Sequence, residues 1–219
     1  MRNKSFIIIF LSLTLLTTCY AQESAVSSKN NIFSMKNFSF KDLHYLRFLL
    51  GNSKDSIEPF KSDGCSSFPD GNPLKNKTMW QHCCVAHDYA YWVGGKEELR
   101  VAADKELGHC VGGEVSKELG KAMEFGVVAG GIPAFFPLAM SYRWAYGWDY
   151  VIGYEEMSEV QKKSIASHLN SVINDFKTRE ANFSVEQNDY IKKHIRSLIV
   201  EYTEYMIPSK QTELINLLD

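Results

Sequence analysis

The segment from Cys83 to Tyr91 constrains this chain more than any other part of its 219 residues. It places two adjacent cysteines, Cys83 and Cys84, one turn before an adjacent base and acid, His87 and Asp88. Neighbouring side chains on a helix point about 100° apart, so His87 and Asp88 can serve different partners from one rigid support. This arrangement suits a base that removes a proton from water beside a carboxylate that holds a metal ion.

The first residues predict export. A basic start at residues 1–4 precedes an uncharged apolar run at residues 5–18, and small residues precede a cleavage site after Ala21. This pattern is typical of a secretory signal peptide covering residues 1–21. Two alternatives stay open. A lipoprotein signal would carry an acyl chain on Cys19, although threonine is unusual just before such a cysteine. A retained anchor would use an apolar run that is short for a membrane span.

Cleavage after Ala21 would remove one of the five cysteines and two basic residues. Four cysteines remain, and an even number in an exported chain predicts two disulfides among Cys65, Cys83, Cys84 and Cys110. The formal net charge of the whole chain is −2, so we expect no nucleic-acid partner. The chain also has no polybasic patch for anionic lipids, so any membrane contact would come from apolar surface.

The remaining pattern predicts a mainly α-helical chain. Residues 22–38 are polar and rich in Asn and Ser, which indicates a flexible leader, and residues 52–77 form one long loop that carries Cys65. Apolar periodicity and capping residues predict the helices. They are expected at 40–50 after Ser39, from Thr78 as N-cap to 93, and at 97–111, 114–125, 158–177 and 185–206.

An apolar, aromatic segment at residues 126–148 has two interpretations. It is interrupted by glycines and prolines, which argues against a membrane span. It could form a buried hairpin against neighbouring helices, which we favour, or an interfacial surface or acyl-chain channel, because Trp and Tyr favour the headgroup zone of a bilayer.

The order of these residues resembles that of the secreted phospholipase A2 family. The pattern Cys-Cys-x-x-His-Asp-x-x-Tyr at residues 83–91 is similar to the active-site helix of that family. The family also has a second helix with an aspartate six residues before a cysteine, which corresponds to Asp104 and Cys110. A glycine-rich calcium loop upstream corresponds to residues 63–65. The resemblance covers roughly residues 40–112.

The resemblance implies a fold and a set of roles. It implies two antiparallel, disulfide-linked active-site helices with a calcium loop in a domain at residues 39–150, followed by a helical extension at 151–219. By analogy, the bridges are Cys65–Cys84 and Cys83–Cys110. His87 would be the general base, with Asp104 orienting its imidazole and Tyr91 supporting Asp104.

The same resemblance implies a calcium ion held by Asp88 and by loop carbonyls of Gly64, Ser66 and Phe68. The last two positions are normally glycine in the family, so Asp70 and Gly71 could take over part of the calcium shell.

The implied activity is calcium-dependent hydrolysis of the sn-2 ester of glycerophospholipids at a membrane or micelle surface. One alternative is a non-catalytic lipid- or membrane-binding module on the same fold. A second alternative is an exported protein in which Cys83, His87 and Cys110 hold a structural zinc ion.

Overall fold

The computed structural model describes residues 55–130, 142–149 and 152–218. The expected signal peptide, flexible leader and helix at 40–50 lie outside these residues, as does the middle of the aromatic segment. Within the described ranges the protein is mainly helical, as predicted, and the β-pairing consists of two isolated bridges, Ile57 with Trp148 and Asn72 with Asn76. No helix in these ranges is long and apolar enough to cross a bilayer.

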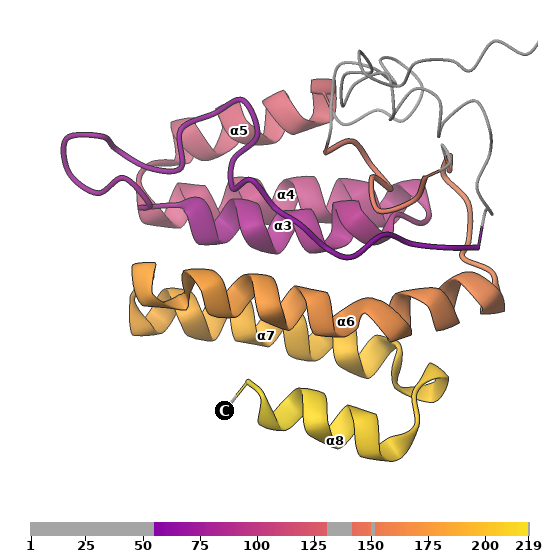
Figure 1. Cartoon of the computed structure of the whole chain (residues 1–219). Helices are drawn as coiled ribbons and strands as arrows, with labels where there is room; N and C mark the ends of the chain where they lie inside the picture. Colours follow the sequence, from indigo (N-terminus) through magenta and orange to yellow (C-terminus); the bar gives the residue numbers. More distant parts are fainter. Residues whose placement is uncertain (1–54, 131–141, 150–151, 219) are drawn as a thin grey trace, which may run out of the picture. The chain divides into compact units, whose positions relative to one another are not determined.

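Six α-helices and two short 3-10 helices make up this part of the chain (Figure 1). They are α3 (Gln81–Val93), α4 (Glu97–Glu114), α5 (Lys117–Gly130), α6 (Glu159–Arg179), η3 (Glu180–Asn182), α7 (Val185–Glu201), η4 (Thr203–Tyr205) and α8 (Pro208–Asn216).

The first two of these helices form a tight antiparallel hairpin. Helix α3 ends before Gly94, which has φ +81°, and a side chain at this position would meet Ala145 2.5 Å away. The predicted end at Val93 is therefore confirmed. The predicted start is wrong, because the hydroxyl of Thr78 hydrogen-bonds to the side chain of Asn76 and the helix begins at Gln81.

One disulfide joins the two helices of this hairpin, and a second joins α3 to the loop before it. Cys83 at the start of α3 is bonded to Cys110 near the end of α4, and Cys84 is bonded to Cys65 in the preceding loop. These are the pairings that the family resemblance implied. Two disulfides in one chain are typical of proteins from an oxidising compartment.

Helix α5 lies closely against α4 because glycines face each other at their contact. A Cβ added at Gly120 would lie 2.2 Å from the carbonyl oxygen of Gly108, so no larger residue fits there without a shift of one helix. The predicted third helix began at Glu114, but α4 runs through to this residue and α5 starts at Lys117.

The C-terminal helices share a core with the first half of the described chain. Helices α6 and α7 begin at the capping boxes of Ser158 and Ser184, where the side chain of each serine accepts a backbone N–H. Buried residues of α3, including Trp92, belong to the same apolar core as Ile165 on α6 and Ile195 on α7. Helix α7 is shorter than predicted, and α8 was not predicted.

The segment before the candidate site runs along α6 and is attached to it by side chains. The backbone N–H of Ile57 donates to Ser164 Oγ at 3.0 Å, and that of Phe60 donates to Ser171 Oγ at 2.8 Å. Further along, Arg179 donates to the carbonyl oxygen of Ser62.

The described end of the aromatic segment packs against the end of α3. Trp144 and Trp148 are buried, and their indole N–H groups donate to the carbonyls of Gly95 and Val93. This part fits the buried interpretation. The described start of the segment does not form a hairpin strand, because residues 126–130 continue helix α5.

Candidate active site

His87 and Asp104 meet between α3 and α4. The Nε2 atom of His87 lies 3.1 Å from Oδ1 of Asp104, and both side chains are buried. The two residues are 17 positions apart in the sequence, and the antiparallel hairpin brings them together. This hydrogen bond orients the imidazole and leaves Nδ1 as the nitrogen that can accept a proton from another group.

Two further side chains hold Asp104. The hydroxyl of Tyr91 donates to its Oδ1 at 2.7 Å, and Arg100 donates to its Oδ2 at 2.8 Å. Asp104 is 1% exposed, and these hydrogen bonds satisfy both oxygens of its buried carboxylate. The motif predicted this role for Tyr91 but not for Arg100, which lies one turn before Asp104 on the same face of α4.

The surroundings of His87 favour its charged form. Burial lowers the pKa of His87, but the hydrogen bond to Asp104 and the negative charges of Asp88 and Asp104 outweigh burial, so the pKa lies above its usual value. The Nδ1 atom of His87 lies 3.8 Å from Oδ1 of Asp88. The imidazole therefore stands between two carboxylates.

Asp88 faces the loop that carries Cys65. Its Oδ2 accepts a hydrogen bond from Ser62 Oγ at 2.6 Å, a contact that no motif in the sequence predicted. Asp88 is 5% exposed, and burial together with the nearby charge of Asp63 raises its pKa against the opposing effects of His87 and Ser62. A divalent cation between Asp63 and Asp88 would offset both the burial and the repulsion.

The predicted loop ligands line the same pocket as Asp88. Gly64 has φ +85°, which a larger residue adopts only with strain, and Ser66 donates to Asp63 Oδ1 at 2.7 Å. Phe68 closes a turn by donating its N–H to the carbonyl of Cys65 at 3.0 Å.

The structure gives Asp70 a different role from the one expected. Its Oδ1 accepts the backbone N–H of Cys65 at 2.8 Å, and its Oδ2 accepts from the side chain of Gln81 at 2.7 Å. Asp70 thus joins the loop to the start of α3. Neither Asp70 nor Gly71 lines the pocket.

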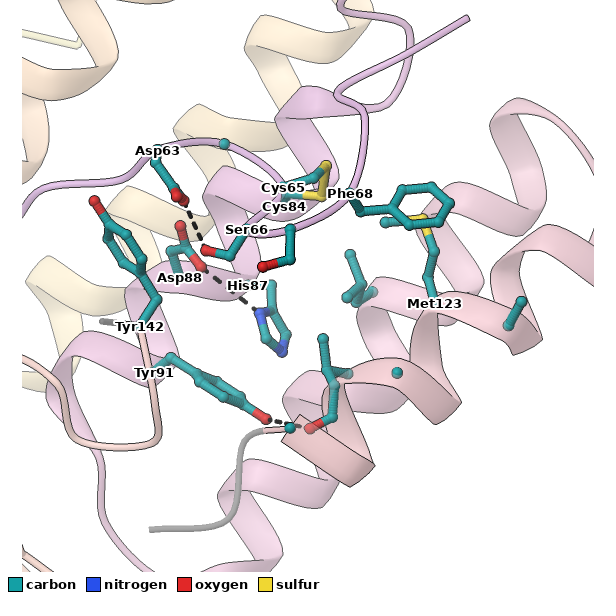
Figure 2. A pocket seen from close by; sticks show the side chains of 17 residues that line it. Asp63, Cys65, Ser66, Phe68, Cys84, His87, Asp88, Tyr91, Met123 and Tyr142 are labelled. Carbon is teal, nitrogen blue, oxygen red and sulfur yellow. Dashed lines mark hydrogen bonds and ion pairs between the residues drawn. A yellow bond between two sulfur atoms is a disulfide. The ribbon is translucent and has the colours of Figure 1, made fainter. Parts of the chain in front are cut away.

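The site opens into a pocket of about 360 Å³ with two chemically distinct sides (Figure 2). The imidazole of His87 lies between them. Acidic and hydroxyl groups form one side: Asp63, Asp88 and Tyr142. Apolar side chains from the loop, α4 and α5 line the other: Phe68, Leu107, Met123 and Val127. Such a pocket can hold a molecule that has a charged group at one end and a hydrocarbon chain at the other.

The alternative zinc site of Cys83, His87 and Cys110 is not formed. The two sulfurs are bonded to each other, and Nε2 of His87 is hydrogen-bonded to Asp104. The histidine that lies beside these sulfurs is His82, whose Nε2 is 3.4 Å from Cys83 Sγ and 3.6 Å from Cys110 Sγ.

Comparisons of the chain with protein-family models, curated proteins and solved structures found no match. The interpretation of the site therefore rests on its own geometry and on the motif residues.

Proposed function

We propose that the protein is a calcium-dependent hydrolase that cleaves the sn-2 ester of glycerophospholipids. One observation carries this proposal: His87 is fixed by Asp104 at one nitrogen, while its other nitrogen faces a carboxylate at the polar end of a half-apolar pocket. A positioned histidine beside a cation-binding carboxylate is suited to activate water for attack on an ester.

The roles of the protein side chains follow from their contacts. In its neutral form, His87 takes a proton at Nδ1 from the attacking water, and the imidazolium that forms is stabilised by the carboxylate of Asp104. Tyr91 and Arg100 hold Asp104 in place, so the imidazole cannot turn away from the water. The proton then returns from Nδ1 to the leaving alkoxide when the ester bond breaks.

The donor set beside His87 fits a calcium ion. Asp63 and Asp88 would supply carboxylate oxygens, and Gly64, Ser66 and Phe68, which line the same pocket, would supply backbone carbonyls. When bound, the ion supplies Lewis-acid stabilisation of the oxyanion that develops on the ester carbonyl.

The surface around the pocket supports a lipid substrate. Helix α5 turns Met123 and Val127 toward the pocket, and it leaves Phe125 and Val128 73% and 40% exposed. Phe68 at the loop is 42% exposed. Exposed apolar side chains near a pocket favour an aggregate of lipid over a dissolved ester.

A non-catalytic lipid-binding module is the second candidate. It is favoured by the hydrogen bond from Ser62, which already occupies one oxygen of Asp88, and by the non-glycine residues at positions 66 and 68. In this case the pocket would hold a lipid chain without hydrolysis.

Hydrolysis of phosphatidylcholine and phosphatidylglycerol vesicles, with calcium and with a chelator, separates the two candidates. The hydrolase should release fatty acid and lysophospholipid only with calcium, and His87→Gln and Asp88→Asn should each lower the rate by at least about a hundredfold. His109→Gln on the exposed face of α4 is the matched control and should keep full activity. Vesicle binding without turnover under all conditions would refute the hydrolase and support the binding module.

A further inference from the structure

A second set of metal-ligating side chains surrounds the Cys83–Cys110 disulfide, apart from the candidate active site. The ligand atoms of His82, Cys83 and Cys110 all lie within 4.8 Å of one another. A carboxylate joins them, because Oε1 of Glu114 lies 3.3 Å from Nε2 of His82. Two sulfurs, one imidazole nitrogen and one carboxylate oxygen are the ligand types of a tetrahedral zinc site.

The distances around His82 already match such a site. With Zn–S bonds of about 2.3 Å and Zn–N and Zn–O bonds of about 2.1 Å, tetrahedral ligands lie about 3.6 Å apart for N and S and about 3.4 Å apart for N and O. The corresponding separations here are 3.4 and 3.6 Å to the two sulfurs and 3.3 Å to the carboxylate. The two sulfurs, now bonded, are too close and would need to move to about 3.8 Å from each other.

We propose that the reduced chain binds a zinc ion through His82, Cys83, Cys110 and Glu114, and that this site and the Cys83–Cys110 disulfide exclude each other. The zinc ion would join α3 to α4 at the same place as the disulfide. The two helices that carry His87 and Asp104 would thus remain cross-linked before the disulfide forms and after it is reduced.

The environment of His82 supports this assignment. The imidazole is 2% exposed and lies against the rings of Phe183 and Tyr190, which fix its orientation. Its Nδ1 atom has no hydrogen-bond partner among the described residues, so Nδ1 is free to carry the proton while Nε2 binds the metal. Glu114 is 32% exposed and gives a cation access to the site.

The chemistry balances in both directions. A dithiol reductant supplies two electrons to the sulfur–sulfur bond, each sulfur takes a proton, and the reductant becomes a disulfide. Zinc then displaces the two thiol protons as it binds both sulfurs. An oxidant that accepts two electrons from the thiolates restores the disulfide and releases the zinc ion.

Alkylation mapping of the full chain tests the proposal. The chain is reduced with a dithiol and incubated with or without zinc. It is then alkylated, and the modified cysteines are identified by mass spectrometry. Zinc should slow alkylation of Cys83 and Cys110 by at least about tenfold, and it should leave Cys65 and Cys84 reactive. Equal protection of Cys65, Cys83, Cys84 and Cys110, or protection of none of them, would overturn the proposal.

Variants and a spectroscopic probe complete the test. Cobalt bound to the reduced chain should show thiolate charge-transfer absorption and the intense visible bands of four-coordinate cobalt. His82→Ala and Glu114→Ala should each weaken binding by about tenfold or more, whereas His109→Ala should not change it. An undiminished cobalt affinity in His82→Ala would show that two thiolates alone account for binding and would refute the site. The oxidised chain should bind neither ion at these cysteines.

Discussion

Lowering the pH should destabilise the protein through His82. Burial of this imidazole lowers its pKa from 6.5 to about 4, whereas in the unfolded chain the pKa is close to 6.5. Between these values the unfolded chain binds a proton that the folded protein does not bind. The free energy of unfolding therefore falls as the pH falls from 6.5 toward 4.

The size of this effect follows from the shift. One pKa unit corresponds to about 1.4 kcal/mol. Protonation of His82 should therefore lower the free energy of unfolding by about 2 kcal/mol at pH 5 and by about 3 kcal/mol at pH 4, relative to pH 7. This is a large part of the 5–15 kcal/mol that holds a typical domain folded.

Urea unfolding of the wild-type protein and of His82→Phe, each at pH 7 and pH 5, measures this effect. This variant keeps a ring against Phe183 and Tyr190 but cannot take a proton. The wild-type protein should lose about 2 kcal/mol more than the variant between the two pH values. His109→Gln, which changes an exposed histidine, should behave like the wild type. Equal losses in wild type and His82→Phe would refute the argument that His82 is buried in its neutral form.

Three further substitutions test the packing and the buried charges. Asp104→Ala leaves the buried Arg100 without its carboxylate and should lower the free energy of unfolding by about 3–5 kcal/mol; a loss below 1 kcal/mol in urea unfolding would contradict this. Gly94→Ala forces a side chain into a position with φ +81° and should lower the free energy of unfolding by about 1–2 kcal/mol, measured as a lower melting temperature. An unchanged melting temperature would contradict the described conformation at the end of α3. Leu214→Ala on α8 removes a fully buried side chain and should cost about 2–5 kcal/mol, whereas Leu217→Ala, at a residue 36% exposed, should cost clearly less in the same assay. Equal costs at the two leucines would mean that α8 does not contribute to the core.

Helices with local signals were predicted well from the sequence. The end of α3 at Gly94 and the starts of α6 and α7 at Ser158 and Ser184 depend on residues within one turn of the boundary. The helix expected at 185–206 was too long, because its apolar period continues past Tyr202, where the chain turns into η4. Helix α8 begins with Pro208, a signal that was present but was not used.

Residues of the candidate site could be predicted only where they lie at fixed distances from one another in a sequence motif. His87, Asp88 and Tyr91 lie on one helix, and the resemblance supplied Asp104 through its distance from Cys110. Ser62 reaches Asp88 across 26 residues, and no local pattern marks such a contact. Similarly, the alternative zinc site named His87 beside Cys83 and Cys110, whereas the histidine that lies beside these sulfurs is His82, because the direction of each side chain on α3 depends on its packing against α4 and α7.

The attachment of residues 57–62 to α6 makes the position of Asp88 depend on residues in the C-terminal half of the chain. Arg179 on α6 holds the backbone of Ser62, and Ser62 in turn holds the carboxylate of Asp88. A substitution at the end of α6 can therefore alter the candidate cation site without touching it. We therefore expect substitutions at the end of α6 to be selected together with those of the loop. A fragment ending at residue 150 would contain His87, Asp88 and Asp104 but would lack Arg179, which holds the backbone of Ser62.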